Sequence, residues 1–130
     1  LIVPPNHPLA GRTSVRYQEL ESEKFIFLGD EYMLTSNVVA GCREAGFEPR
    51  TLLQVTQWDF AVQLVKLNMG ISVLPRRILA MYPEPGVVQI QLDHSSSAWD
   101  VVMVTQKGQY QSFATQAFMK YIQENAGTQQ

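Results

Sequence analysis

Apolar residues occur along the chain in short runs separated by polar turns, which predicts an α/β domain. Residues 24–28 and 51–55 have the length of strands, and 24–28 is apolar on both faces, as in a central strand. A third run, 71–74, ends at Pro75, which has no amide to donate to a strand ladder. We therefore expect a small, mainly parallel three-stranded sheet with helices between its strands.

The stretch 55–75 predicts the central βαβ unit. Thr56 is followed three residues later by Asp59, a spacing typical of a capping box at the start of a helix. Asn68 and Gly70 follow the helix, and both residue types accept the left-handed backbone that a sharp return requires. A capping role alone would account for Thr56, so a ligand role needs further support.

A second helix is expected before residue 51. It begins at Thr35 or Ser36, since either side chain can cap a helix. It ends at Gly46, where Phe47 can supply the hydrophobic contact of a left-handed C-terminal cap. Cys42 then lies on the apolar face of this helix and is expected to be a core residue.

The C-terminal third predicts two strands and a helix. Residues 87–92 alternate like a half-exposed strand, and 99–105 form a longer apolar strand. The helix is capped by Ser112 and extends to about Glu124. Its apolar stripe has helical spacing and consists of Ala114, Ala117, Phe118, Tyr121 and Ile122.

Two loops, 29–36 and 55–58, are expected at the carboxyl edge of the parallel strands. Helix-start amides converge at such an edge and favour ligand binding there. The candidate ligand-binding residues are Gly29, Thr35, Ser36, Thr56, Gln57 and Trp58. Asp30 and Glu31 lie at the same edge and oppose an anion, so the charge of the ligand stays open.

Composition excludes several classes of protein. The 130 residues suit one domain, and the net charge of −2 offers no basic surface for nucleic acid. No enzyme motif or metal-ligand spacing is present, so we expect no catalytic residue, metal or cofactor. No apolar run has membrane-spanning length, and the single cysteine fits a cytoplasmic protein.

Three segments, taken in order, resemble the effector-binding domain of LysR-type transcriptional regulators. They are the opening 1–10 with its His-Pro-Leu-Ala, the Gly-x-x-Pro turn within 42–49, and Leu-Val-x4-Gly-Ile-x2-Leu-Pro over 64–75. Asn68 departs from the family, which usually has glycine there. Asparagine tolerates the same left-handed backbone, so the turn should be retained.

The resemblance implies a type 2 periplasmic-binding-protein-like fold. Residues 1–5 would form the first hinge strand and 6–98 the second lobe. Residues 99–130 would form the return strand and C-terminal helix of a first lobe that is otherwise absent. A small-molecule effector would bind between the lobes and modulate a DNA-bound oligomer, with DNA contacted only through an absent N-terminal helix-turn-helix. Self-association is expected, and this part alone should bind effector weakly.

Two other classes of function fit the residues. One is a lobe of a solute-binding protein, or another small-molecule-binding domain with the same βαβ plan. The other is a protein–protein interaction domain with no small ligand. An upstream helix-turn-helix would favour the regulator and a secretory signal the solute-binding protein, while a thermal-shift screen with small ligands would separate out the interaction domain.

Overall fold

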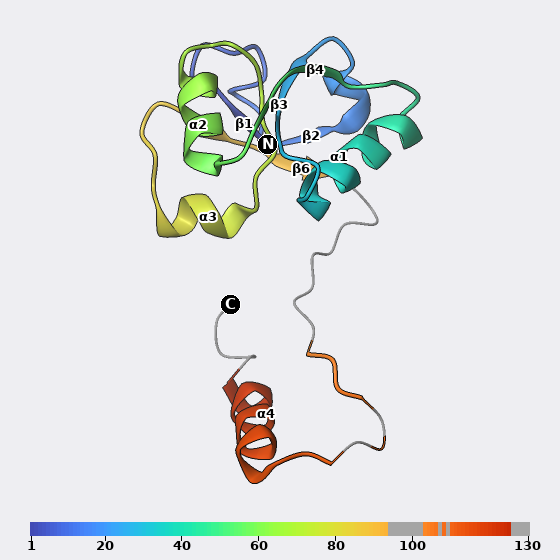
Figure 1. Ribbon diagram of the computed structural model, residues 1–130. Helices are drawn as coiled ribbons and strands as arrows, with labels where there is room; N and C mark the ends of the chain where they lie inside the picture. The colour runs from blue at the N-terminus through green and yellow to red at the C-terminus, as the bar shows by residue number, and fades with distance from the viewer. Residues whose placement is uncertain (94–102, 107, 109, 126–130) are drawn as a thin grey trace. The chain divides into compact units, whose positions relative to one another are not determined.

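The computed structural model describes residues 1–93, 103–106, 108 and 110–125. They fall into two compact units, Leu1–Ala98 and Trp99–Gln130 (Figure 1). Among the residues described, unit 1 contains all the strands and three α-helices, and unit 2 contains one α-helix. Within the described residues, no helix has the length and apolarity needed to cross a membrane.

Strand β3 (Lys24–Leu28) is the centre of unit 1. It pairs in parallel with β4 (Arg50–Val55), with a bulge between Phe25 and Ile26. Its residues 25–28 are all buried. The two faces of β3 lie in separate cores, because Phe25 and Phe27 belong to one cluster and Ile26 and Leu28 to another. This explains why the strand is apolar on both faces, as the sequence predicted.

The two cores receive different helices. The first core cluster consists of Leu1, Val3, Val15, Tyr17, Leu20, Phe25, Phe27, Val38, Cys42, Ile71 and Ile90. The second core cluster consists of Ile2, Ile26, Leu28, Val55, Ala61, Val62, Leu64, Val65, Leu74 and Leu79. Helix α1 (Met33–Glu44) and the 3₁₀ helix η1 (Tyr17–Leu20) contribute to the first cluster. Helices α2 (Trp58–Lys66) and α3 (Arg76–Met81) contribute to the second.

The predicted third strand lies beside β3, but it is reduced to two bridged residues. Ile71 bridges Phe25 in parallel, and its carbonyl accepts the Ile26 amide at 2.8 Å. Ser72 bridges Ile2 in antiparallel, and its hydroxyl donates to the Ile26 carbonyl at 2.7 Å. The segment thus joins β3 to the first residues of the chain.

The remaining strands form two further pairs. Strand β1 (Ile2–Val3) pairs in antiparallel with β5 (Val88–Gln89), and β2 (Ser14–Arg16) pairs in parallel with β6 (Gln91–Asp93). Strands β5 and β6 correspond to the predicted strand 87–92, whereas β2 was not predicted. Between β5 and β6, the amide and carbonyl of Ile90 both bond to Leu1.

Helix α1 begins earlier than predicted. Its N-cap is Tyr32, so Thr35 lies inside the first turn and neither Thr35 nor Ser36 is the cap. The Thr35 hydroxyl donates instead to the Leu28 carbonyl at 2.8 Å. The cap prediction was wrong because this tertiary partner on β3 takes the hydroxyl.

The predicted end of α1 is confirmed. Gly46 has φ 97°, and the Phe47 amide donates to the Cys42 carbonyl at 3.1 Å. The Gly46 amide donates to the Arg43 carbonyl at 3.0 Å, which completes a Schellman motif. Cys42 is fully buried, and burial raises the pKa of its thiol to about 11, so it is a core residue as expected.

The capping box predicted at Thr56 is not formed. Helix α2 begins at Trp58 with Gln57 as its N-cap, one residue later than a Thr56 cap requires. Gln57 is extended, with φ −127° and ψ 133°, so the Thr56 hydroxyl is displaced from the first-turn amides. The Asp59 carboxylate accepts the Phe60 amide at 2.9 Å instead of returning to Thr56.

Unit 2 contains helix α4 (Phe113–Asn125), which begins where the sequence predicted. The Ser112 hydroxyl accepts the Thr115 amide at 3.2 Å and so caps it. None of the helix's residues is buried. Of the predicted strand 99–105, residues 99–102 lie outside the described part, and 103–105 adopt no strand conformation.

The return after α2 uses left-handed backbone at Asn68, where φ is 57°. We expect Asn68→Gly to be neutral or mildly stabilising, since glycine adopts this conformation without strain. We expect Asn68→Val to lose about 1–2 kcal/mol, because a β-branched side chain crowds the backbone there. Urea unfolding of the two variants measures the difference. Equal midpoints would contradict a requirement for left-handed backbone at this residue.

Candidate functional site

The carboxyl ends of β3 and β4 bring the two predicted ligand loops together in unit 1. The Gly29 amide donates to the Val55 carbonyl at 3.0 Å. The Tyr32 hydroxyl, from the other end of the first loop, donates to the Thr56 carbonyl at 3.1 Å. Gly29 and Thr56, which are far apart in the sequence, are therefore neighbours at one edge of the strands. In Figure 1 this edge is also where α1 and α2 begin.

The predicted polar site residues differ in accessibility. Ser36, Thr56 and Gln57 are exposed, and their side chains form no hydrogen bond within the described part of the chain. Thr35 is 5% exposed and its hydroxyl is bonded to Leu28. Ser36, Thr56 and Gln57 are thus accessible to a ligand, whereas the Thr35 hydroxyl is not.

Trp58 lies beside this polar group and pairs with an aromatic residue that the sequence did not reveal. Its ring packs against the second core cluster and lies 5.6 Å from the Tyr82 ring, tilted by 32°. Tyr82 comes from the end of α3, which lies at the end of unit 1 where α2 begins (Figure 1). The sequence carries no local signal for this pair, because its members belong to different helices.

Three carboxylates surround the loops. Asp30 accepts a hydrogen bond from the Gln54 amide group at 2.7 Å, and Asp59 accepts the Phe60 amide. The Glu31 carboxylate folds over Gly29, where an added Cβ would meet it. Gly29 therefore leaves the space that the Glu31 side chain occupies.

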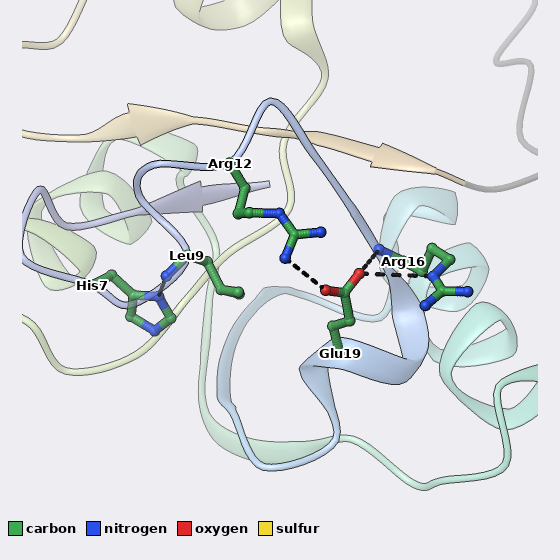
Figure 2. Close-up of polar contacts among 5 residues, drawn as sticks. All are labelled: His7, Leu9, Arg12, Arg16 and Glu19. Atoms are coloured by element: carbon green, nitrogen blue, oxygen red, sulfur yellow. Dashed lines mark hydrogen bonds and ion pairs between the residues drawn. The ribbon is translucent and has the colours of Figure 1, made fainter.

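A second polar cluster lies in the turns around β2 and supports the fold (Figure 2). Within it, His7 Nδ1 accepts the Leu9 amide at 3.2 Å, so this histidine stabilises the turn before β2. Glu19 accepts the Arg16 amide at 2.9 Å and pairs with Arg12 at 3.1 Å. The Arg16 amide, together with the Arg12 and Arg16 charges, holds the pKa of Glu19 below its usual value. These contacts order the connection from β2 to η1.

No group of three or more histidine, cysteine, aspartate or glutamate residues suited to a metal ion occurs within the described residues. The residues at the strand edge carry hydroxyl, amide, carboxylate and aromatic groups. These groups offer hydrogen bonds and ring stacking.

The chain matches the family model described as LysR substrate binding domain over residues 1–127. It is 33% identical over 121 residues to the uncharacterized HTH-type transcriptional regulator YwbI, and 24% identical over 121 residues to the transcriptional dual regulator GltC, both of Bacillus subtilis. Each alignment covers 93% of this chain and 40% of the relative. The chain thus spans about 40% of the length of these relatives.

Solved structures share the fold. The effector binding domain of QuiR in complex with shikimate is 25% identical, with a TM-score of 0.69 over 92% of this chain and 56% of that chain. The regulatory domain of CcmR from Synechocystis PCC6803, in complex with 2-PG, is 20% identical, with a TM-score of 0.77 over 98% and 62%. These matches confirm the predicted α/β class and its type 2 periplasmic-binding-protein-like plan. Because the family model extends over nearly the whole sequence, the chain belongs to the LysR substrate binding domain family.

Proposed function

We propose that this chain is the effector-sensing part of a LysR-type transcriptional regulator and that a small metabolite binds at loops 29–36 and 55–58. The observation that carries the proposal is the junction of these loops through the Gly29–Val55 and Tyr32–Thr56 hydrogen bonds. The junction gathers unpaired polar side chains beside the start of a helix, an arrangement suited to orienting a small ligand. The structural neighbours bound to shikimate and 2-PG support a small metabolite as the ligand.

In this proposal Ser36, Thr56 and Gln57 contact the effector, and Trp58 supplies an apolar wall. Gly29 leaves room for the Glu31 carboxylate to fold over the loop, while Thr35 fixes the first turn of α1 through Leu28. The other lobe closes over the effector, and the closure changes the geometry of a regulator oligomer. DNA would be bound by a helix-turn-helix elsewhere in the protein, and the HTH-type relatives support this division of roles. The chain's own residues perform no chemical conversion.

Thr56 provides the sharpest test of the site. We expect Thr56→Val in the full-length regulator to weaken effector binding tenfold or more, since it removes a hydroxyl that pairs with the ligand. Thr56→Ser keeps the hydroxyl and should retain binding. The effector is first found by a thermal-shift screen of metabolites, and its affinity for each variant is then measured by titration calorimetry.

The same variants separate binding from folding. The Thr56 hydroxyl makes no capping bond, so Thr56→Val should change the free energy of unfolding by less than about 0.5 kcal/mol. A stable Thr56→Val protein with full effector affinity would remove Thr56 from the site. A screen in which no small molecule raises the melting temperature would contradict the proposed function itself.

A further inference from the structure

Two aromatic residues, Tyr32 and Trp58, lie near Thr56. Tyr32 is attached to it by the hydroxyl–carbonyl hydrogen bond of 3.1 Å and is 40% exposed. Trp58 follows it by two residues and stacks at a tilt on Tyr82, which is 56% exposed. An exposed aromatic ring beside unpaired polar groups is a surface on which a flat ligand can stack.

The second core cluster supports the Trp58–Tyr82 pair. Trp58 packs on the second core cluster, and α3 is anchored in the same cluster by Leu79, which is 3% exposed. The Tyr82 amide donates to the Ile78 carbonyl at 2.9 Å, which fixes the end of α3 where the ring begins. The two rings therefore form a preorganised surface, and a ligand that stacks on them avoids most of the ordering cost.

The charges at this edge disfavour an anion. Loops 29–36 and 55–60 contain three acids and no lysine or arginine. The positive end of α2 is already matched by the chain's own Asp59, which accepts the Phe60 amide. Lys24 and Arg50, the cations that precede these loops, begin β3 and β4 at the opposite ends of the strands. Lys66 ends α2 and pairs with Glu84 at 3.3 Å. Arg76 and Arg77 begin α3, whereas Tyr82 follows its last residue.

We propose that the effector presents a planar aromatic ring to the Trp58–Tyr82 pair, hydrogen-bonds to Thr56 and Gln57, and is neutral or cationic where it meets these loops. The inference rests on the proposed function and specifies the class of its ligand. Ring stacking supplies the contact with the pair, and a cationic substituent gains from both the ring faces and the surrounding carboxylates. A non-aromatic carboxylate gains no ring stacking, and it is attracted neither to the ring faces nor to the carboxylates.

The test uses matched small probes on the full-length regulator. Phenethylamine and 2-cyclohexylethylamine have the same charge and differ in aromaticity, whereas tyramine and 4-hydroxyphenylacetate share a ring and differ in charge. We expect phenethylamine and tyramine to bind roughly tenfold more tightly than their partners, measured by ligand-observed NMR titration.

Two variant pairs place the ring contact on named residues. Tyr82→Leu and Trp58→Leu remove a ring, whereas Tyr82→Phe and Trp58→Phe keep one. We expect the leucine variants to bind tyramine roughly tenfold less tightly, with the phenylalanine variants near the parent. Tyr82 is exposed, so Tyr82→Leu should fold even if Trp58→Leu loses stability through its core contacts.

The outcomes distinguish this inference from the proposed function. Equal binding of 2-cyclohexylethylamine and phenethylamine, or full tyramine affinity in Tyr82→Leu, would overturn the aromatic contact. Stronger binding of 4-hydroxyphenylacetate than of tyramine would overturn the neutral or cationic charge. If non-aromatic anions from the metabolite screen bind and lose affinity in Thr56→Val, the proposed function stands and this inference is wrong. If no compound of any class binds, both are wrong.

Discussion

Replacing Gly70 with alanine is expected to lower the free energy of unfolding by about 2–3 kcal/mol. A Cβ at this position would lie 2.5 Å from the Lys24 carbonyl oxygen, which also accepts the Ile71 amide at 2.8 Å. That oxygen is part of the β3 backbone and cannot move without disturbing the central strand. The added methyl would therefore separate the bridged segment at Ile71 from β3.

Gly11→Ala is the matched control, because a Cβ at Gly11 meets nothing within 4 Å. It should leave stability within about 0.5 kcal/mol of the parent. Chemical unfolding of the two variants under the same conditions gives both values. A Gly70→Ala protein as stable as the control would show that the approach to Lys24 can relax at little cost.

When residues 1–130 are prepared with Leu1 as the first residue, their free energy of unfolding should also fall by about 2–3 kcal/mol as the pH is lowered from 9 to 5, through the Leu1 amino group. This group is buried and donates to the Ile90 carbonyl at 2.9 Å. Burial lowers its pKa from an ordinary value of 8.0 to about 6. Above pH 8 the amino group is neutral in both the folded and the unfolded chain, so it does not reduce the free energy of unfolding. Between pH 8 and 6 the unfolded chain binds more protons, so stability falls as the pH falls, and the full loss is reached below about pH 6.

Acetylating the Leu1 amino group gives the control for this effect. The acetylated nitrogen cannot ionise, yet it keeps an N–H that can donate to Ile90. Thermal or urea unfolding from pH 5 to 9 should show the pH dependence in the free chain and a smaller one after acetylation. Identical pH profiles for the two forms would mean that the Leu1 amino group ionises equally in the folded and unfolded states.

Local patterns predicted the elements whose partners are close in sequence. Gly46 with Phe47 ended α1, Ser112 began α4, and Asn68 took the left-handed backbone of the return, each through bonds within one helical turn. The strand 24–28 was likewise predicted, because a strand that is buried on both faces, as β3 is, must be apolar on both.

Three features were missed because they depend on contacts between different elements. The Thr35 hydroxyl was expected to cap α1 and bonds to Leu28 on β3 instead. Gly70 was expected to supply left-handed backbone, whereas its role is to admit the Lys24 carbonyl. Tyr82 joins the candidate site only through the packing of α3 beside Trp58. No periodicity within a single element encodes any of these contacts.

Strand β1 has a consequence for the order in which unit 1 forms during synthesis. Its residues emerge first, yet they pair with β5, and Leu1 bonds to Ile90 across 89 positions of the chain. Residues 1–3 therefore stay unpaired with β5 until almost all of unit 1 has been synthesised. Closing so long a loop costs entropy before its contacts form, which slows folding. The first segment of unit 1 to be made is thus expected to be among the last to form its native contacts, after β3 and β4 have already paired.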